Sequence, residues 1–168
     1  GWVTTGPKVK EFEKQLSEYL NAKHVIAVNS CTAALHISLA AKGIGSGDKF
    51  IAPTYTFVAS VEVGEYLGAS PILVDSNPET FNLDLDQVEK LLYNDKSQKI
   101  KAIIPVHFAG QAVDMVRINK LSEKYNLFVV EDAAHAVETI SNTGKVGNTS
   151  HAAAFSFYAN KNITTGGE

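Results

Sequence analysis

The chain has 168 residues, of which 45% are hydrophobic and 20% charged, and its formal net charge is −3. A chain of this length buries roughly 70% of the surface that it exposes when unfolded, so its core needs no disulfide or metal for stability. The single cysteine, Cys31, excludes an intramolecular disulfide and every metal site built from several thiolates, and it is typical of a reducing cytosol. Basic residues are scattered singly, which argues against a nucleic-acid partner, and no apolar run reaches the ~20 residues that span a bilayer. We therefore predict a cytoplasmic protein that binds neither nucleic acid nor membrane and holds no metal.

Helical and strand-like patterns alternate along the chain. Three segments have apolar residues at a helical period: Val9, Phe12, Leu16 and Leu20; Leu85, Val88, Leu91 and Leu92; and Ile118, Leu121 and Tyr125. Pro7, Asp84 and Asp114 mark the expected helix starts. Short apolar runs lie between them: HVIAV from His24, KFIAP from Lys49, PILVD from Pro71, KAIIPVHF from Lys101, LFVVED from Leu127 and AAAFSF from Ala152.

Most of these runs are apolar on both faces, as strands are when a parallel sheet is covered on both sides. The alternation predicts a single α/β domain over residues 1–168, a doubly wound and mostly parallel sheet flanked by helices on both faces. Ligands of such sheets bind at the carboxyl ends of the strands, so the loops that follow the strands are where a functional site is expected.

The segment NSCTAALH, residues 29–36, follows a predicted strand and begins a helix. The amides of Cys31, Thr32 and Ala33, with the Thr32 hydroxyl, would lie at the positive end of that helix, where a dianionic phosphate can bind. The alternative is an ordinary Ser or Asn helix cap, which this segment taken by itself favours. We interpret Cys31 as a small packing residue rather than a nucleophile.

An aromatic pair follows the strand KFIAP, in the loop PTYTF of residues 53–57. An aromatic side chain in this loop can lie over a flat ring. Taken alone, however, the loop favours Tyr55 and Phe57 as core residues.

Two adjacent carboxylates, Glu131 and Asp132, end a wholly apolar strand. An acid in that position is costly unless it meets a cation or a hydrogen-bond donor. Asp132 could cap a helix. It could equally hold a heterocyclic nitrogen protonated, with His135 as a hydrogen-bonding neighbour one helical turn later.

The last strand is followed by a lysine in a short polar loop. The strand is expected to end at Ser156 and Phe157, and Lys161 would then extend over the same sheet edge as Asp132. Most loop lysines are solvated, but an amine near a ring-binding carboxylate suggests Schiff-base chemistry.

Together these segments resemble the DegT/StrS family of sugar aminotransferases, which are fold type I enzymes that use pyridoxal 5′-phosphate (PLP). Each motif alone is weak, but their order along the chain is highly specific. The matching motifs are TTGPKVKEFE (4–13), NSCTAALH (29–36), PTYTFVAS (53–60), ETFNLD (79–84), PVHFAGQAVDM (105–115), VVEDAAHA (129–136) and FSFYANKNITTGGE (155–168).

The resemblance implies a role for each matching position. Lys161 would bind the cofactor covalently and move protons, Asp132 would pair with the pyridine nitrogen, and His135 would lie beside the ring hydroxyl. Phe57 occupies the ring-stacking position. The implied phosphate contacts are Cys31, Thr32, Ala33 and Ser156.

The implied reaction transfers an amino group, with glutamate as the donor, to the keto carbon of a nucleotide-linked deoxysugar, for bacterial surface polysaccharide or amino-sugar biosynthesis. Members of the family are homodimers with shared active sites, and they have a small C-terminal domain after the large PLP-binding domain. We therefore expect residues 1–168 to be an incomplete large domain, a fragment that lacks the rest of that domain and the small C-terminal domain. A PLP-dependent sugar dehydratase and a non-catalytic module that binds PLP or a sugar nucleotide are the alternatives, and Lys161 argues against the dehydratase, which has His there.

Overall fold

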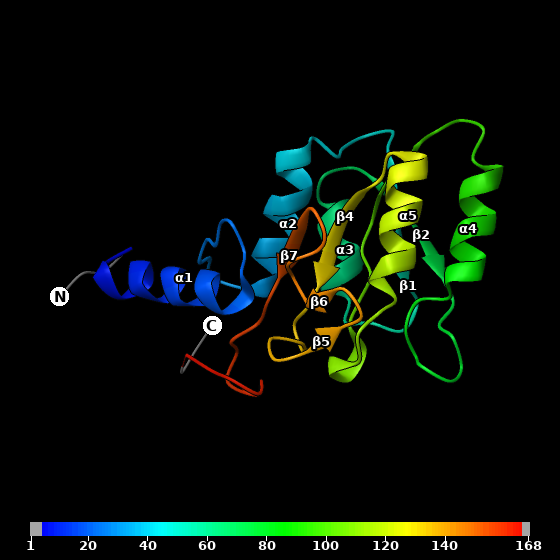
Figure 1. Ribbon diagram of the computed structural model, residues 1–168. Helices are drawn as coiled ribbons and strands as arrows, with labels where there is room; N and C mark the ends of the chain where they lie inside the picture. Colours follow the sequence, from blue (N-terminus) through cyan, green and yellow to red (C-terminus); the bar gives the residue numbers. More distant parts are fainter. Residues whose placement is uncertain (1–4, 166–168) are drawn as a thin grey trace.

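A computed structural model describes residues 5–165 and shows a five-stranded parallel sheet with helices on both faces (Figure 1). The strand order is β2-β1-β3-β4-β7, and a separate antiparallel pair, β5-β6, forms a small hairpin. The elements in chain order are α1 (Pro7–Leu20), α2 (Cys31–Lys42), β1 (Lys49–Pro53), α3 (Ala59–Glu65), β2 (Ser70–Val74), α4 (Leu85–Asn94), β3 (Ile100–Ile103), a 3₁₀ turn (Phe108–Gly110), α5 (Met115–Tyr125), β4 (Phe128–Asp132), β5 (Ile140–Ser141), β6 (Gly144–Lys145) and β7 (Ala152–Ala154). The predicted α/β architecture is confirmed.

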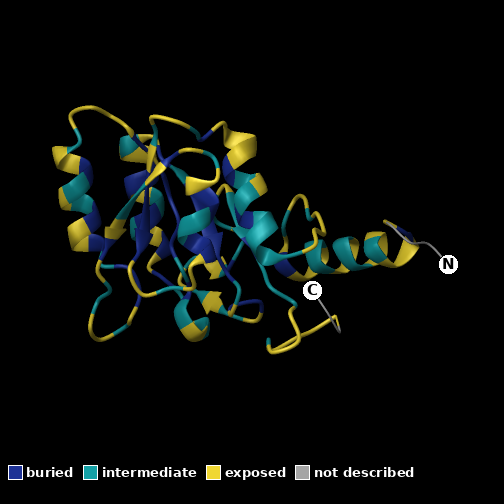
Figure 2. Cartoon of the chain, turned by 180° about the vertical axis from the view of Figure 1, so that it is seen from behind, coloured by how far each residue is buried: buried dark blue, intermediate teal, exposed yellow. Residues whose placement is uncertain are grey.

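The core has two layers, one on each face of the sheet. Leu35 and Leu39 of α2 and Val63 of α3 pack on one face, and α4 and α5 cover the other. Alternation along β4 divides its side chains between the two layers, with Val129 in the α4/α5 layer and Val130 in the α2/α3 layer. The buried residues line the strands at the centre of the molecule (Figure 2).

Helix starts follow the capping signals in the sequence. Pro7 is the first residue of α1, and the side chains of Asp84 and Asp114 accept hydrogen bonds from first-turn amides of α4 and α5. These three predicted starts are confirmed. Within residues 5–165, no helix has the length and apolar character needed to cross a membrane.

The prediction of a strand at residues 24–28 is wrong. Within the described part of the chain, no neighbouring strand pairs with this apolar run, and Ile26 is 79% exposed. The Ala27 N–H instead donates a hydrogen bond to the Glu13 carboxylate of α1 at 2.8 Å. A strand requires a ladder partner, which an apolar sequence does not supply by itself.

Two further strands end earlier than predicted. β3 stops at Ile103, just before Pro105, whose nitrogen cannot donate to a ladder. β7 stops at Ala154, so Ser156 and Phe157 lie in the following loop. Thr4 of the first family motif and residues 166–168 of the last lie outside the described part of the chain.

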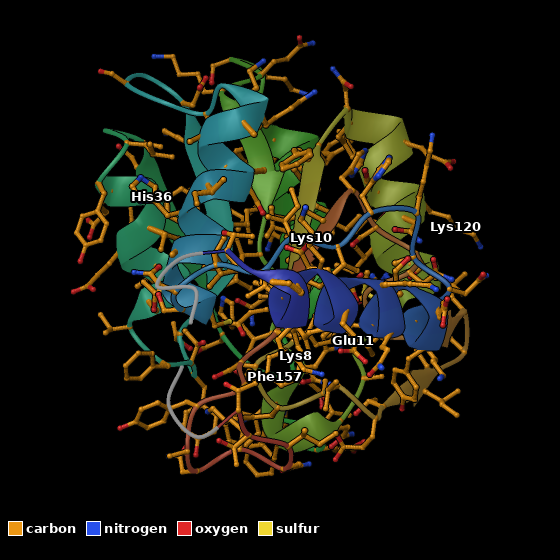
Figure 3. All side chains as sticks on the ribbon, turned by 90° about the vertical axis from the view of Figure 1, so that its left-hand side faces the viewer. Lys8, Lys10, Glu11, His36, Lys120 and Phe157 are labelled. Carbon is orange, nitrogen blue, oxygen red and sulfur yellow. The ribbon has the colours of Figure 1, made fainter. Side chains whose placement is uncertain are left out.

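Helix α1 projects from the side of the α/β body (Figures 1 and 2). Its apolar stripe meets the loop after β7, where the rings of Phe12 and Phe157 make an edge-to-face contact with centroids 5.0 Å apart. Phe157 lies beneath the helix in Figure 3. Lys145 of the hairpin adds a hydrogen bond of 2.6 Å to the carbonyl of Tyr19 near the end of the helix.

We predict that Gly64→Ala destabilises the fold by about 1–3 kcal/mol, because a β-carbon at this position of α3 would lie 2.2 Å from the Phe50 ring. Alanine favours a helix over glycine, so a loss of stability would report the clash. The measurement is urea unfolding followed by circular dichroism. Gly45→Ala is the matched control, since its β-carbon would meet only the Leu67 carbonyl at 3.6 Å, and equal midpoints for the two variants would contradict the prediction.

Candidate functional site

Most of the predicted site residues lie around one edge of the sheet. The five strands are parallel, so their carboxyl ends meet at the edge toward which β4 points in Figure 1. Asp132 ends β4, His135 lies in the turn after it, and Lys161 and Ser156 follow β7. Phe57 follows β1. The topology therefore brings together residues that are more than 100 positions apart in the sequence.

Asp132 is the most buried of these residues, with 6% of its surface exposed. Its carboxylate accepts hydrogen bonds from the hydroxyl of Ser60 at 2.7 Å and from the amide of Ala134 at 3.1 Å. The cost of burying the acid is thus met by donors, as the sequence required. The Ala134 contact closes a tight turn rather than the first turn of a helix, so the expected helical spacing to His135 is wrong.

Glu131 is fully buried and faces the other layer of the core. It accepts hydrogen bonds from the Ser150 hydroxyl at 2.5 Å, the His107 Nε2–H at 2.8 Å and the Gly147 amide at 3.3 Å. The Val113 amide donates to His107 Nδ1 at 3.1 Å, which assigns the hydrogen of the neutral imidazole to Nε2. Among residues 5–165, no three His, Cys, Asp or Glu side chains are arranged to hold a metal ion.

Lys161 and His135 contact each other directly, with Nζ 3.0 Å from Nε2. Partial burial and the positive charge of Lys161 lower the pKa of His135, and the negative charge of Asp132 opposes them. The imidazole is therefore neutral at pH 7, so its Nε2 accepts a hydrogen bond from the lysine ammonium. The three side chains form one electrostatically coupled group.

The start of α2 has both features that its sequence suggested, a serine helix cap and amide and hydroxyl donors that could bind a phosphate. Ser30 is the N-cap, and its hydroxyl accepts a hydrogen bond from the Ala33 amide at 3.1 Å. The Thr32 amide and hydroxyl have no hydrogen-bond partner among residues 5–165. Cys31 is half-buried and packs against the α2/α3 layer, as expected. The helix start thus retains donors that point to an anion site, with Ala33 already engaged by the cap.

The aromatic residues after β1 are exposed, so the expectation that they belong to the core is wrong. Phe57 is 75% exposed and Tyr55 is 52% exposed. Tyr55 contacts two further rings, Phe108 at 4.6 Å and Phe81 at 6.1 Å between centroids. Phe57 is not among the rings in this cluster, and its exposed face is free to cover a flat ligand.

A groove of about 870 Å³ lies beside this edge, between α1, the start of α2 and the end of β7. Its lining includes Ser30, Cys31, Phe155 and Phe157. It does not include Asp132 and its neighbours, so this groove adjoins the candidate site rather than containing it. Ser156 is not among the lining residues, although its neighbours Phe155 and Phe157 are.

Three residues that touch the site were not predicted. Ser60 and Thr56 form a hydroxyl pair with oxygens 2.7 Å apart beside Asp132, and His107 supports the neighbouring Glu131. The signal for the first pair was two hydroxyl residues four positions apart directly after an apolar strand. His107 followed another apolar run, but which carboxylate it meets depends on tertiary contacts that the sequence does not reveal.

A parallel sheet with a carboxylate, a lysine–histidine pair and a helix start at one edge is typical of a cofactor-dependent α/β enzyme. The model of the DegT/DnrJ/EryC1/StrS aminotransferase family matches residues 1–168, and the chain belongs to that family.

Curated relatives include the spore coat polysaccharide biosynthesis protein SpsC of Bacillus subtilis and the GDP-perosamine synthase of Caulobacter vibrioides. The chain is 45% identical to each, over 99% and 98% of its own length. It covers only 42% and 44% of the two proteins, so it spans less than half the length of these relatives.

Solved structures agree with this assignment. DesV of S. venezuelae, solved in complex with a ketimine intermediate, is 35% identical and superposes with a TM-score of 0.91, covering 97% of this chain and 43% of its own. NtdA of Bacillus subtilis, with bound cofactor PMP, is 36% identical with a TM-score of 0.89, covering 98% of this chain and 36% of its own. The chain thus has the same fold as the matched 43% and 36% of these two proteins.

We predict that Lys161→Met raises the pKa of His135, because it removes the positive charge that contributes to lowering it. Asp132→Asn should lower the same pKa further, because it removes an opposing negative charge. The measurement is an NMR titration of the imidazole in the cofactor-free protein. Lys120→Met, on the exposed face of α5, is the control and should leave the titration of His135 unchanged (Figure 3). Identical midpoints in all the variants would refute the coupling.

Proposed function

We propose that this chain is part of the large domain of a PLP-dependent aminotransferase that moves an amino group from glutamate to the keto carbon of a nucleotide-linked deoxysugar. The observation that carries the proposal is the Lys161–His135 contact of 3.0 Å within electrostatic range of the buried Asp132 carboxylate. Relatives named for GDP-perosamine synthesis and for spore coat polysaccharide biosynthesis support the sugar substrate and a role in bacterial surface polysaccharide or amino-sugar biosynthesis.

The residues at the sheet edge fit PLP in the chemistry of their donors and acceptors. Asp132 has two hydrogen-bond donors on a carboxylate that can accept about four, which leaves capacity for the N–H of a pyridine ring. Phe57 offers an exposed aromatic face, and Thr32 offers an amide and a hydroxyl to a phosphate. The Spr1654 protein of Streptococcus pneumoniae, 36% identical over 98% of this chain, has been solved in a PLP form.

Each residue then has a distinct task. When bound, PLP supplies an electron sink that stabilises negative charge beside the transferred nitrogen. Asp132 holds the proton on the ring nitrogen, and Lys161 supplies the amine that binds the cofactor and later carries a proton at Nζ. His135, neutral at Nε2, accepts a hydrogen bond from Lys161 and orients it. Cys31, Thr32 and Ser156 bind the phosphate beside Ala33, whose amide is held by the Ser30 hydroxyl.

Lysine at position 161 favours amino transfer over the dehydratase alternative, because a primary amine at this position can bind the cofactor covalently. Of the non-catalytic alternatives, a module that binds only a sugar nucleotide would leave the Lys161–His135 pair without a task. A module that binds PLP without turnover would use the pair, and the substrate test below distinguishes it. We further propose that the protein acts in the cytoplasm as a homodimer whose two subunits share the active sites, with a small C-terminal domain that completes each site.

The first test of the proposal maps the covalent link. The full-length protein is loaded with PLP, reduced with borohydride and digested, and the modified peptide is identified by mass spectrometry. We expect the label on Lys161, because it is the lysine paired with His135 at this sheet edge. Lys161→Arg should lose both the label and the visible absorbance of the bound cofactor. A label on any other lysine would refute the assignment.

The second test addresses the substrate. The full-length protein carrying the amino form of the cofactor is mixed with nucleotide-linked 4-keto-6-deoxysugars, with other ketosugar nucleotides and with simple 2-keto acids. The family resemblance predicts that a 4-keto-6-deoxysugar nucleotide restores the absorbance of lysine-bound PLP, since a ketone must reach the amine in a bonding geometry. Restoration by 2-keto acids alone, other than the partner of glutamate, would indicate an amino-acid aminotransferase instead.

A further inference from the structure

We propose that Ser60, together with Thr56, is a positioning residue that holds the Asp132 carboxylate in one orientation toward the cofactor and fixes it relative to Phe57. This inference rests on the proposed function, and it concerns two residues to which the family resemblance assigned no role. It concerns a hydroxyl pair between α3 and the end of β4.

Ser60 is completely buried and connects three parts of the site. Its hydroxyl lies 2.7 Å from the Asp132 carboxylate and 2.7 Å from the Thr56 hydroxyl. Its amide donates to the Phe57 carbonyl at 3.1 Å, in the turn that begins α3. One residue therefore contacts both the acid and the loop that carries the exposed aromatic ring.

The hydrogen bonds that link Thr56, Ser60 and Asp132 have a fixed donor-to-acceptor direction. An ionised carboxylate only accepts hydrogen bonds, so the single hydroxyl hydrogen of Ser60 goes to Asp132. The Thr56 hydroxyl must then donate to the Ser60 oxygen. Donation by Thr56 polarises the Ser60 hydroxyl and strengthens its bond to the acid.

Two donors on different oxygens prevent the carboxylate from turning about its own axis. Ser60 holds one oxygen of Asp132, and the Ala134 amide holds the other. Without Ser60, the carboxylate would be held at one oxygen only and could rotate about that contact. An ion pair with a ring nitrogen depends on the direction of the acceptor, so this rotation would weaken it.

The test uses the full-length protein and PLP labelled with ¹⁵N at the ring nitrogen. The two measurements are the dissociation constant of PLP, by absorbance titration, and the pH at which the ¹⁵N chemical shift reports loss of the ring proton. For Ser60→Ala we expect roughly tenfold weaker PLP binding and loss of the ring proton at lower pH than in the wild type. Thr56→Val should change both in the same direction by a smaller factor, and Thr56→Ser should restore them.

Ser122→Ala is the matched control. Ser122 is also buried, at 6% exposure, and its hydroxyl donates to the Leu127 carbonyl at 2.8 Å, before the start of β4 rather than at its carboxyl end. It should lower the thermal midpoint without moving the ¹⁵N shift, which separates a general loss of stability from misplacement of the acid.

Each outcome decides the proposal. Wild-type-like binding and ¹⁵N titration in Ser60→Ala would overturn it, while leaving the proposed function intact. If Ser60→Ala does not fold, Thr56→Val decides, because Thr56 is only half-buried and keeps its shape as valine. A wild-type protein that binds no PLP would refute the proposed function, and the positioning role with it.

Discussion

Two adjacent buried carboxylates at the end of β4 constrain the whole carboxyl edge of the sheet. Burying a charge without partners costs several kcal/mol, so Glu131 and Asp132 each require donors from other parts of the chain. Because neighbouring residues of a strand point to opposite faces, the two acids collect their donors from different layers. Glu131 binds His107, Gly147 and Ser150, while Asp132 binds Ser60 and Ala134. The same hydrogen bonds that compensate for the burial of these acids hold the surrounding loops together.

This arrangement explains how a site made of loops can be well ordered. The loop after β3 is held through His107, and the segment before β7 is held through Gly147 and Ser150. Asp132, the neighbour of the residue that makes these contacts, is placed by the same strand. Lys161 is half-buried in the loop after β7, and Phe57 is exposed in the loop after β1. Hydrogen-bonded support of this kind is what a site needs in order to orient a reacting group.

Much of this architecture could be predicted from the sequence, because apolar runs and helix caps are local signals. The starts of α1, α4 and α5 followed from Pro7, Asp84 and Asp114, and the double-sided core followed from strands that are apolar on both faces. The run at 24–28 carried the same signal but has no ladder partner among the described residues, and pairing is not a local property. The loop of Phe57, taken alone, favoured a core position for a related reason, since an aromatic residue in a sequence is typical of the core; only the family resemblance assigned Phe57 to ring stacking.

The site shows the same division between local and tertiary information. Asp132, His135 and Lys161 were nominated from their places after strands and from the family resemblance, and the fold brings them to one edge. The partners of these residues were not found, because the sequence does not reveal that α3 packs its first turn against the end of β4. Ser60 and Thr56 lay inside a recognised motif, yet only the contact with Asp132 gives them a task.

The alternation of β4 also has a consequence for how such a domain can change in evolution. A shift of one residue along this strand would turn each acid to the opposite face, so that either Glu131 would take the place of Asp132 beside Ser60 or Asp132 would take the place of Glu131 beside His107. Glutamate is longer than aspartate by one methylene, so neither set of donors would fit its new partner. A single-residue insertion or deletion in β4 would therefore separate the acids from their donors. The length and register of β4 are therefore the features of the domain that tolerate change least.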